Sequence, residues 1–107
     1  MKTSLFIFLL LITGAIAVAQ NNLPVRALRS NDINKPLILY ITGDGGFNSF
    51  STAFMNELNK NGYAVVALDA KTYFWKKKMP QEAASDVERL MSSYLSTWNY
   101  KNFFIIG

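Results

Sequence analysis

Three apolar runs with little polar alternation divide this chain, and they cover about residues 37–42, 63–68 and 102–106. Strands that are buried on both faces have this pattern. Between these runs, apolar residues recur at helical spacing over about residues 49–60 and 80–98. The order strand, helix, strand, helix, strand predicts an α/β fold with three layers and a parallel sheet.

Local signals predict where the helices begin and end. Asn48 or Ser49 is expected to cap the first helix, and Asn61-Gly62 to end it. Pro80 suits the first position of the second helix, where its missing N–H leaves no hydrogen bond unmade, and Glu82 complements the helix dipole. Residues 70–79 are expected to be irregular.

The helical spacing also predicts which side chains face the sheet. In the first helix the predicted apolar face holds Phe50, Ala53, Phe54 and Leu58. In the second helix the apolar stripe leaves out Asp86, Glu88 and Arg89, which are expected to lie off it.

The N-terminus has the three parts of a secretory signal peptide. Lys2 precedes an apolar block over residues 5–12, and Ala17-Val18-Ala19 ends the segment with small residues. We expect cleavage after Ala19 and export to the periplasm. An uncut membrane anchor is the alternative, but a spanning helix usually needs about 20 predominantly apolar residues. Removal of 19 of the 107 residues leaves 88, enough for one small domain, with residues 20–35 as a polar lead and 36–107 as the domain.

Composition excludes several kinds of site. The chain contains no cysteine and no histidine, so a disulfide scaffold and a thiolate metal site are ruled out, and the commonest general base is missing. We expect no metal and no cofactor. The net charge of +4 is too small to predict a nucleic-acid partner.

Candidate chemistry lies where the predicted strands end, because ligands bind at the carboxyl ends of parallel strands. The Gly-rich loop after the first strand could present the backbone amides of Asp44, Gly45 and Gly46 to an oxyanion. Gly107 after the third strand could be the first glycine of a G-x-S-x-G nucleophile elbow. The alternative for the Gly-rich loop is a tight turn that only starts the helix, and the alternative for Gly107 is an ordinary strand end. Neither G-x-G-x-x-G nor a P-loop is present, which disfavours dinucleotide binding.

The second strand is followed by candidate substrate-binding residues. Asp69 could contact a polar or cationic group, although capping of a loop is the more common role of such a carboxylate. Tyr73 and Trp75 could line a pocket, or pack under the loop with Phe74. The basic run at 76–78 could attract anionic lipid headgroups, or simply be solvated.

In order and spacing, residues 36–107 resemble the bacterial virulence protein family VirJ/AcvB. The residues that carry the resemblance are Gly43-Asp44-Gly45-Gly46, Ala67-Leu68-Asp69, Tyr73-Phe74-Trp75, Pro80 to Asp86 and Phe104-Ile105-Ile106-Gly107. The resemblance implies an α/β-hydrolase-like domain that continues Gly107-Tyr-Ser-Phe-Gly-Ala, with the nucleophilic serine two positions past Gly107. The triad acid and histidine would follow later.

Two functions remain open from the sequence. The first is an exported serine hydrolase of which this chain is an N-terminal fragment, inactive alone, whose parent cleaves an ester. The resemblance implies an aminoacyl-phospholipid as one candidate substrate. The second is an exported non-catalytic module that binds secretion-system proteins. A serine at the centre of an elbow after Gly107 would distinguish them.

Overall fold

The computed structural model describes residues 23–107. The predicted signal peptide, residues 1–19, lies outside the described residues. The elements follow in the order β1 (Val25–Leu28), β2 (Leu37–Ile41), α2 (Ser49–Lys60), β3 (Val65–Leu68), α3 (Ala70–Tyr73), α4 (Pro80–Trp98) and β4 (Phe103–Ile106). Within residues 23–107, none of the helices combines the length and the apolar character that a membrane-spanning segment needs.

The sheet contains the three predicted strands and one that the sequence did not predict. Its order is β1-β3-β2-β4, with β3, β2 and β4 parallel and β1 antiparallel to β3. The prediction of a wholly parallel sheet is therefore wrong at one edge. Strand β1 lies within the predicted polar lead, and its two central residues, Arg26 and Ala27, are exposed, as is common in an edge strand.

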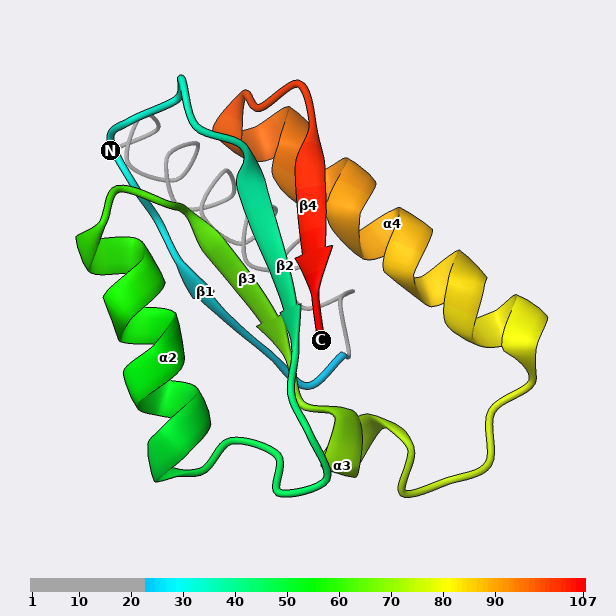
Figure 1. Ribbon diagram of the computed structural model, residues 1–107. Coiled ribbons are helices and arrows are strands. Elements are labelled where there is room, and N and C mark those ends of the chain that lie inside the picture. The colour runs from blue at the N-terminus through cyan, green and yellow to red at the C-terminus, as the bar shows by residue number, and fades with distance from the viewer. Residues whose placement is uncertain (1–22) are drawn as a thin grey trace, which may run out of the picture.

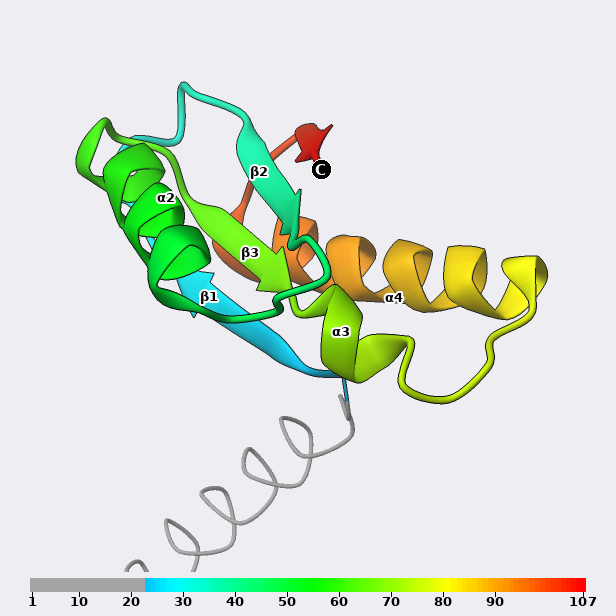
Figure 2. The ribbon, with the colours of Figure 1, turned by 60° about the horizontal axis from the view of Figure 1, so that its bottom comes forward.

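Helices cover the two faces of this sheet, which confirms the predicted three-layer α/β architecture (Figures 1 and 2). On one face α4 packs Leu90 and Met91 against Leu37, Leu39 and Val66. On the other face α2 packs Met55 against Ile38, Tyr40 and Val65. Because successive residues of a strand point to opposite faces, the apolar runs of β2 and β3 supply both cores.

The predicted helix ends are confirmed. Asn48 caps α2: its side-chain oxygen accepts from the Ser51 N–H at 2.9 Å, and the Ser51 hydroxyl accepts from the Asn48 N–H at 2.8 Å. Gly62, just past α2, has φ +96°, and Asn99 ends α4 at φ 63°. Pro80 stands in the first turn of α4. Residues 70–79 are not wholly irregular, because α3 forms one short turn there.

The predicted apolar faces are correct only in part. Phe50 is 72% exposed and Ala53 is exposed, while Ser51 and Met55 face inward, so the buried face of α2 is rotated from the prediction. Asp86 was expected off the apolar stripe of α4 but is buried, because it is hydrogen-bonded to Tyr73.

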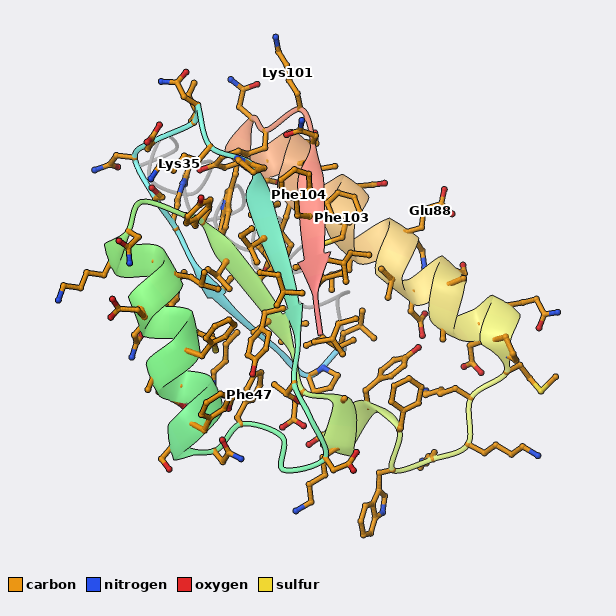
Figure 3. The ribbon with its side chains drawn as sticks, viewed as in Figure 1. Lys35, Phe47, Glu88, Lys101, Phe103 and Phe104 are labelled. Carbon is orange, nitrogen blue, oxygen red and sulfur yellow. The ribbon has the colours of Figure 1, made fainter. Side chains whose placement is uncertain are left out.

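Strand β4 also differs from its prediction as a fully buried strand. Phe103 packs against the core on the α4 side, but Phe104 and Ile105 are 60% and 58% exposed (Figure 3). The strand pairs only with β2 among the described strands, so it forms an edge of the sheet. Its hydrophobicity alone could not distinguish an edge position from a central one.

Candidate functional site

The ends of the three parallel strands meet at one edge of the sheet, as predicted. Strands β2 and β4 are in register with Tyr40 opposite Ile106, so the residues that follow them lie close together. Gly43 and Gly107 line the same cavity of about 320 Å³. Its other lining residues are Tyr40, Ile41, Phe50, Phe54 and Ile106. The structure therefore brings the start of the predicted oxyanion loop beside the predicted first glycine of the elbow.

The loop after β2, residues 42–48, which we call the glycine loop, is held by hydrogen bonds at several points. Gly46 donates its N–H to the Gly43 carbonyl at 3.0 Å, and its own carbonyl accepts from the buried Ser51 hydroxyl at 2.9 Å. Thr42 Oγ1 accepts from the Ala70 N–H at 2.9 Å, which ties this loop to the one after β3.

Gly46 is a position that requires glycine. Its φ of +64° is in the left-handed region, and a Cβ there would lie 2.6 Å from Oδ1 of Asp69. The Gly46 N–H is already used within the turn. Among the amides predicted to face an oxyanion, those of Asp44 and Gly45 make no hydrogen bond within the described part of the chain. These two N–H groups are therefore available as hydrogen-bond donors to an oxyanion.

Asp69 links the two loops instead of facing open solvent. One carboxylate oxygen accepts from the Thr72 N–H at 3.0 Å and caps α3, and the other accepts from the Phe47 N–H at 3.3 Å. Burial raises the pKa of this carboxyl, but the hydrogen bonds from the backbone outweigh it and hold the pKa below its ordinary value. Asp69 thus has the capping role that the sequence left open, and it does not line the cavity that contains Gly43 and Gly107.

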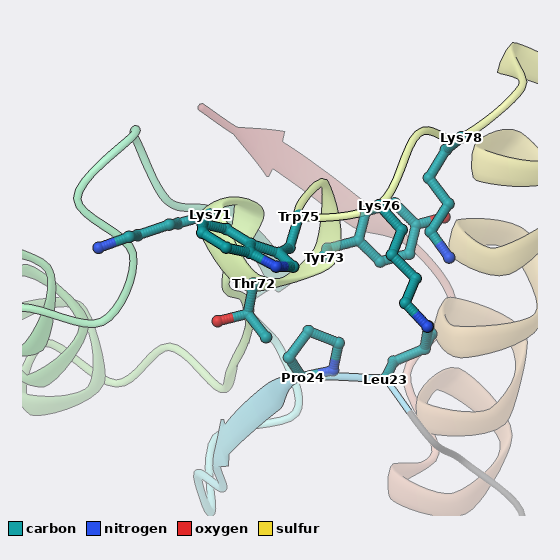
Figure 4. A pocket seen from close by; sticks show the side chains of 8 residues that line it. All are labelled: Leu23, Pro24, Lys71, Thr72, Tyr73, Trp75, Lys76 and Lys78. Carbon is teal, nitrogen blue, oxygen red and sulfur yellow. The ribbon is translucent and has the colours of Figure 1, made fainter.

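Tyr73 and Trp75 line a second hollow, of about 460 Å³, beside the loop after β3 (Figure 4). Its lining residues also include Leu23, Pro24, Lys71, Thr72, Lys76 and Lys78. The two aromatic side chains differ sharply, because Tyr73 is 5% exposed and Trp75 is 80% exposed. Tyr73 is therefore packed under the loop, which was one of the two alternatives from the sequence, whereas Trp75 projects into solvent.

A polar cluster that the sequence did not predict fixes Tyr73 in place, and two of its members, Tyr73 and Asp86, are buried. The Tyr73 hydroxyl donates to Asp86 Oδ2 at 2.6 Å, and Arg89 pairs with the other oxygen of Asp86. Burial, and then the hydrogen bond to Asp86, raise the pKa of Tyr73 to about 12. The same hydrogen bond lowers the pKa of Asp86. The spacing of Asp86 and Arg89 on one helix face was the available signal, but nothing in the sequence indicated Tyr73 as the partner.

Comparison with known proteins gives one match. The family model described as bacterial virulence protein (VirJ) matches residues 35–107. Searches of curated proteins and of solved structures find no match to this chain. The matched range begins just before β2 and includes both candidate loops and Gly107.

Proposed function

This chain belongs to the VirJ family of bacterial virulence proteins, and from that premise we propose that the protein is an exported serine hydrolase that cleaves an ester. The nucleophilic serine stands two positions past Gly107, on the elbow that follows β4. Its attack on the ester carbonyl forms a tetrahedral intermediate, and a histidine takes the serine proton and passes it to the leaving alcohol.

One observation carries this proposal: Gly43 and Gly107 line one cavity at the carboxyl ends of adjacent parallel strands. An elbow serine needs backbone N–H donors from a neighbouring strand-to-helix loop. The amides of Asp44 and Gly45 belong to such a loop and are not used by other groups within the described residues. Glycines at 43 and 45 leave room for an ester to approach this backbone.

The substrate is proposed at the level of chemical class. The cavity is lined mainly by apolar and aromatic side chains, including Phe50 and Phe54, which suits an ester with an apolar portion. An aminoacyl-phospholipid is one such ester. The sequence of residues 1–19 supports export and therefore action in the periplasm, where membrane lipids are accessible.

A fluorophosphonate probe tests the reaction, because it labels only an activated serine. We expect the protein with its natural C-terminus to be labelled, and the modified peptide to contain the serine two positions past Gly107. Replacement of that serine by alanine should abolish labelling. Absence of labelling in a folded protein would instead favour the non-catalytic module that binds secretion-system proteins.

Export is tested separately by N-terminal sequencing of the protein recovered from the periplasm. The expected first residue is Gln20. Recovery of the protein only with Met1 or Lys2 at its start would overturn cleavage after Ala19.

A further inference from the structure

We propose that residues 71–79, the basic–aromatic loop, dock the protein onto the surface of an anionic lipid bilayer. This inference does not depend on the proposed hydrolysis. It concerns a surface of the described fold, made by most of α3 and by the segment that joins α3 to α4 (Figure 1).

The loop exposes an unusual amount of apolar surface. Phe74, Trp75 and Met79 are 55%, 80% and 59% exposed, and they stand within six consecutive residues. Tryptophan is enriched at the membrane–water interface, where its amphipathic ring lies at the level of the headgroups. Exposed hydrophobic side chains at the surface of a domain can insert to that depth without a spanning helix.

The same loop carries a concentrated positive charge. Lys71, Lys76, Lys77 and Lys78 lie in it, and no acidic residue occurs between Ala70 and Gln81. Lys78 is paired with Glu82 at 3.8 Å and lies 4.9 Å from the centre of the Tyr73 ring. The other three lysines are exposed and make no ion pair within the described part of the chain. Their charge is therefore directed outward, around the exposed tryptophan.

A hollow beside these side chains offers space for a headgroup. Figure 4 shows Trp75, Lys76 and Lys71 around the cavity of about 460 Å³, with Leu23 and Pro24 at its floor.

The basic side chains of this loop are of a type that favours binding to a charged bilayer surface over recognition of a single anionic group. All four basic residues of the loop are lysines, which act as point charges, whereas recognition of a single phosphate or carboxylate commonly uses the planar fork of arginine. Polybasic segments are attracted to the diffuse negative charge of an anionic leaflet. Exposed aromatic side chains then supply the apolar contribution that a purely electrostatic contact lacks.

Vesicle sedimentation tests the charge. The full chain is mixed with vesicles of phosphatidylcholine alone, or of phosphatidylcholine with phosphatidylglycerol, and binding to the anionic vesicles is expected to be stronger. Lys71→Gln/Lys76→Gln/Lys77→Gln should weaken that binding about 100-fold, since each lysine contributes about fivefold near an anionic surface. The control Lys60→Gln/Lys101→Gln removes two exposed lysines elsewhere, and it should weaken binding far less for each lysine removed. An equal loss per lysine in the two variants would overturn the proposal.

Fluorescence tests the insertion of Trp75 directly. The chain contains two tryptophans, so Trp98→Phe leaves Trp75 as the single emitter. Brominated lipids in anionic vesicles should quench it strongly, and Trp75→Ala should weaken vesicle binding about tenfold. Ile33→Ala, at another exposed apolar residue, is the control. Unquenched Trp75, or binding to a polyglutamate surface without binding to vesicles, would overturn the proposal and indicate an acidic protein partner.

Discussion

The glycine loop and the basic–aromatic loop follow adjacent parallel strands at the same edge of the sheet. They differ in how far hydrogen bonds hold the backbone and in how many side chains are exposed. In the glycine loop, hydrogen bonds from Ser51 and to Asp69 and Gly43 fix the backbone. In the basic–aromatic loop, backbone hydrogen bonds fix only the turn of α3, and beyond it Trp75, Lys76 and Lys77 project into solvent.

This difference indicates what each loop presents. A backbone held by several side chains has its amides preorganised, which is what stabilisation of a developing charge requires. A loop with exposed aromatic and basic side chains suits a soft and extended surface instead. Asp69 and Thr42 connect the two loops, so a change in one is expected to reach the other through these residues.

Gly46→Ala is expected to have the largest effect on folding, because it acts on the junction of the two loops. The substitution forces a left-handed conformation and places Cβ against the Asp69 carboxylate. We expect the free energy of unfolding to fall by about 2–4 kcal/mol, measured by urea denaturation. At Gly43 a Cβ meets nothing within 4 Å. Gly43→Ala should therefore cost less than about 1 kcal/mol, and equal losses would show that the glycine loop is not fixed at Gly46.

Asp44→Pro tests whether the glycine loop supplies a backbone donor to the reaction. Proline removes the N–H of residue 44, whereas Asp44→Ala keeps it. If this amide stabilises the oxyanion of the proposed reaction, kcat for ester hydrolysis should fall about 100-fold in the proline variant, with a far smaller loss in the alanine variant. Steady-state kinetics with a chromogenic ester measures the difference, and circular dichroism confirms that both variants are folded. Equal rates would remove residue 44 from the oxyanion site.

Asp69→Asn tests the link between the loops through its dependence on pH. The folded pKa of Asp69 is below its ordinary value, so its contribution to stability is present above about pH 4 and is lost as the pH falls through the folded pKa. We expect the variant to lose about 1–2 kcal/mol at neutral pH and to approach the wild type in acid. A constant difference between about pH 2 and 7 would contradict an ionised cap.

The sequence predicted the strands and helices that build the core but not the contacts that hold the edge of the sheet. Uninterrupted apolar runs at β2 and β3 and helical spacing in α4 are strong local signals. Strand β1 has only Val25 and Leu28 as inward residues, and its pairing with β3 is a long-range contact without a local signature. The juxtaposition of Gly43 and Gly107 followed from the parallel order of the strands. The contact of Tyr73 with Asp86 depends on how the chain between them turns, which spacing does not reveal.

Tyr73→Phe is expected to have the smallest effect on stability. It distinguishes the contribution of the packed Tyr73 ring, which anchors the basic–aromatic loop, from that of the Tyr73 hydroxyl and its ionisation. Loss of the hydrogen bond to Asp86 should cost about 1 kcal/mol. Tyr94→Phe is the control, since the Tyr94 hydroxyl makes no hydrogen bond within the described residues. Because the pKa of Tyr73 is raised to about 12, its contribution is complete below about pH 10 and is lost as the pH rises toward 12.

The wild type should therefore lose stability over that alkaline range, and Tyr73→Phe should lose less of it. Absorbance of the phenolate, followed together with thermal unfolding, measures both changes. The substitution should also let the pKa of Asp86 rise toward its ordinary value, because the Tyr73 hydroxyl is the main cause of its depression. An unchanged alkaline profile would show that Tyr73 anchors the loop by packing alone, and that its hydroxyl adds nothing to the difference between the two loops.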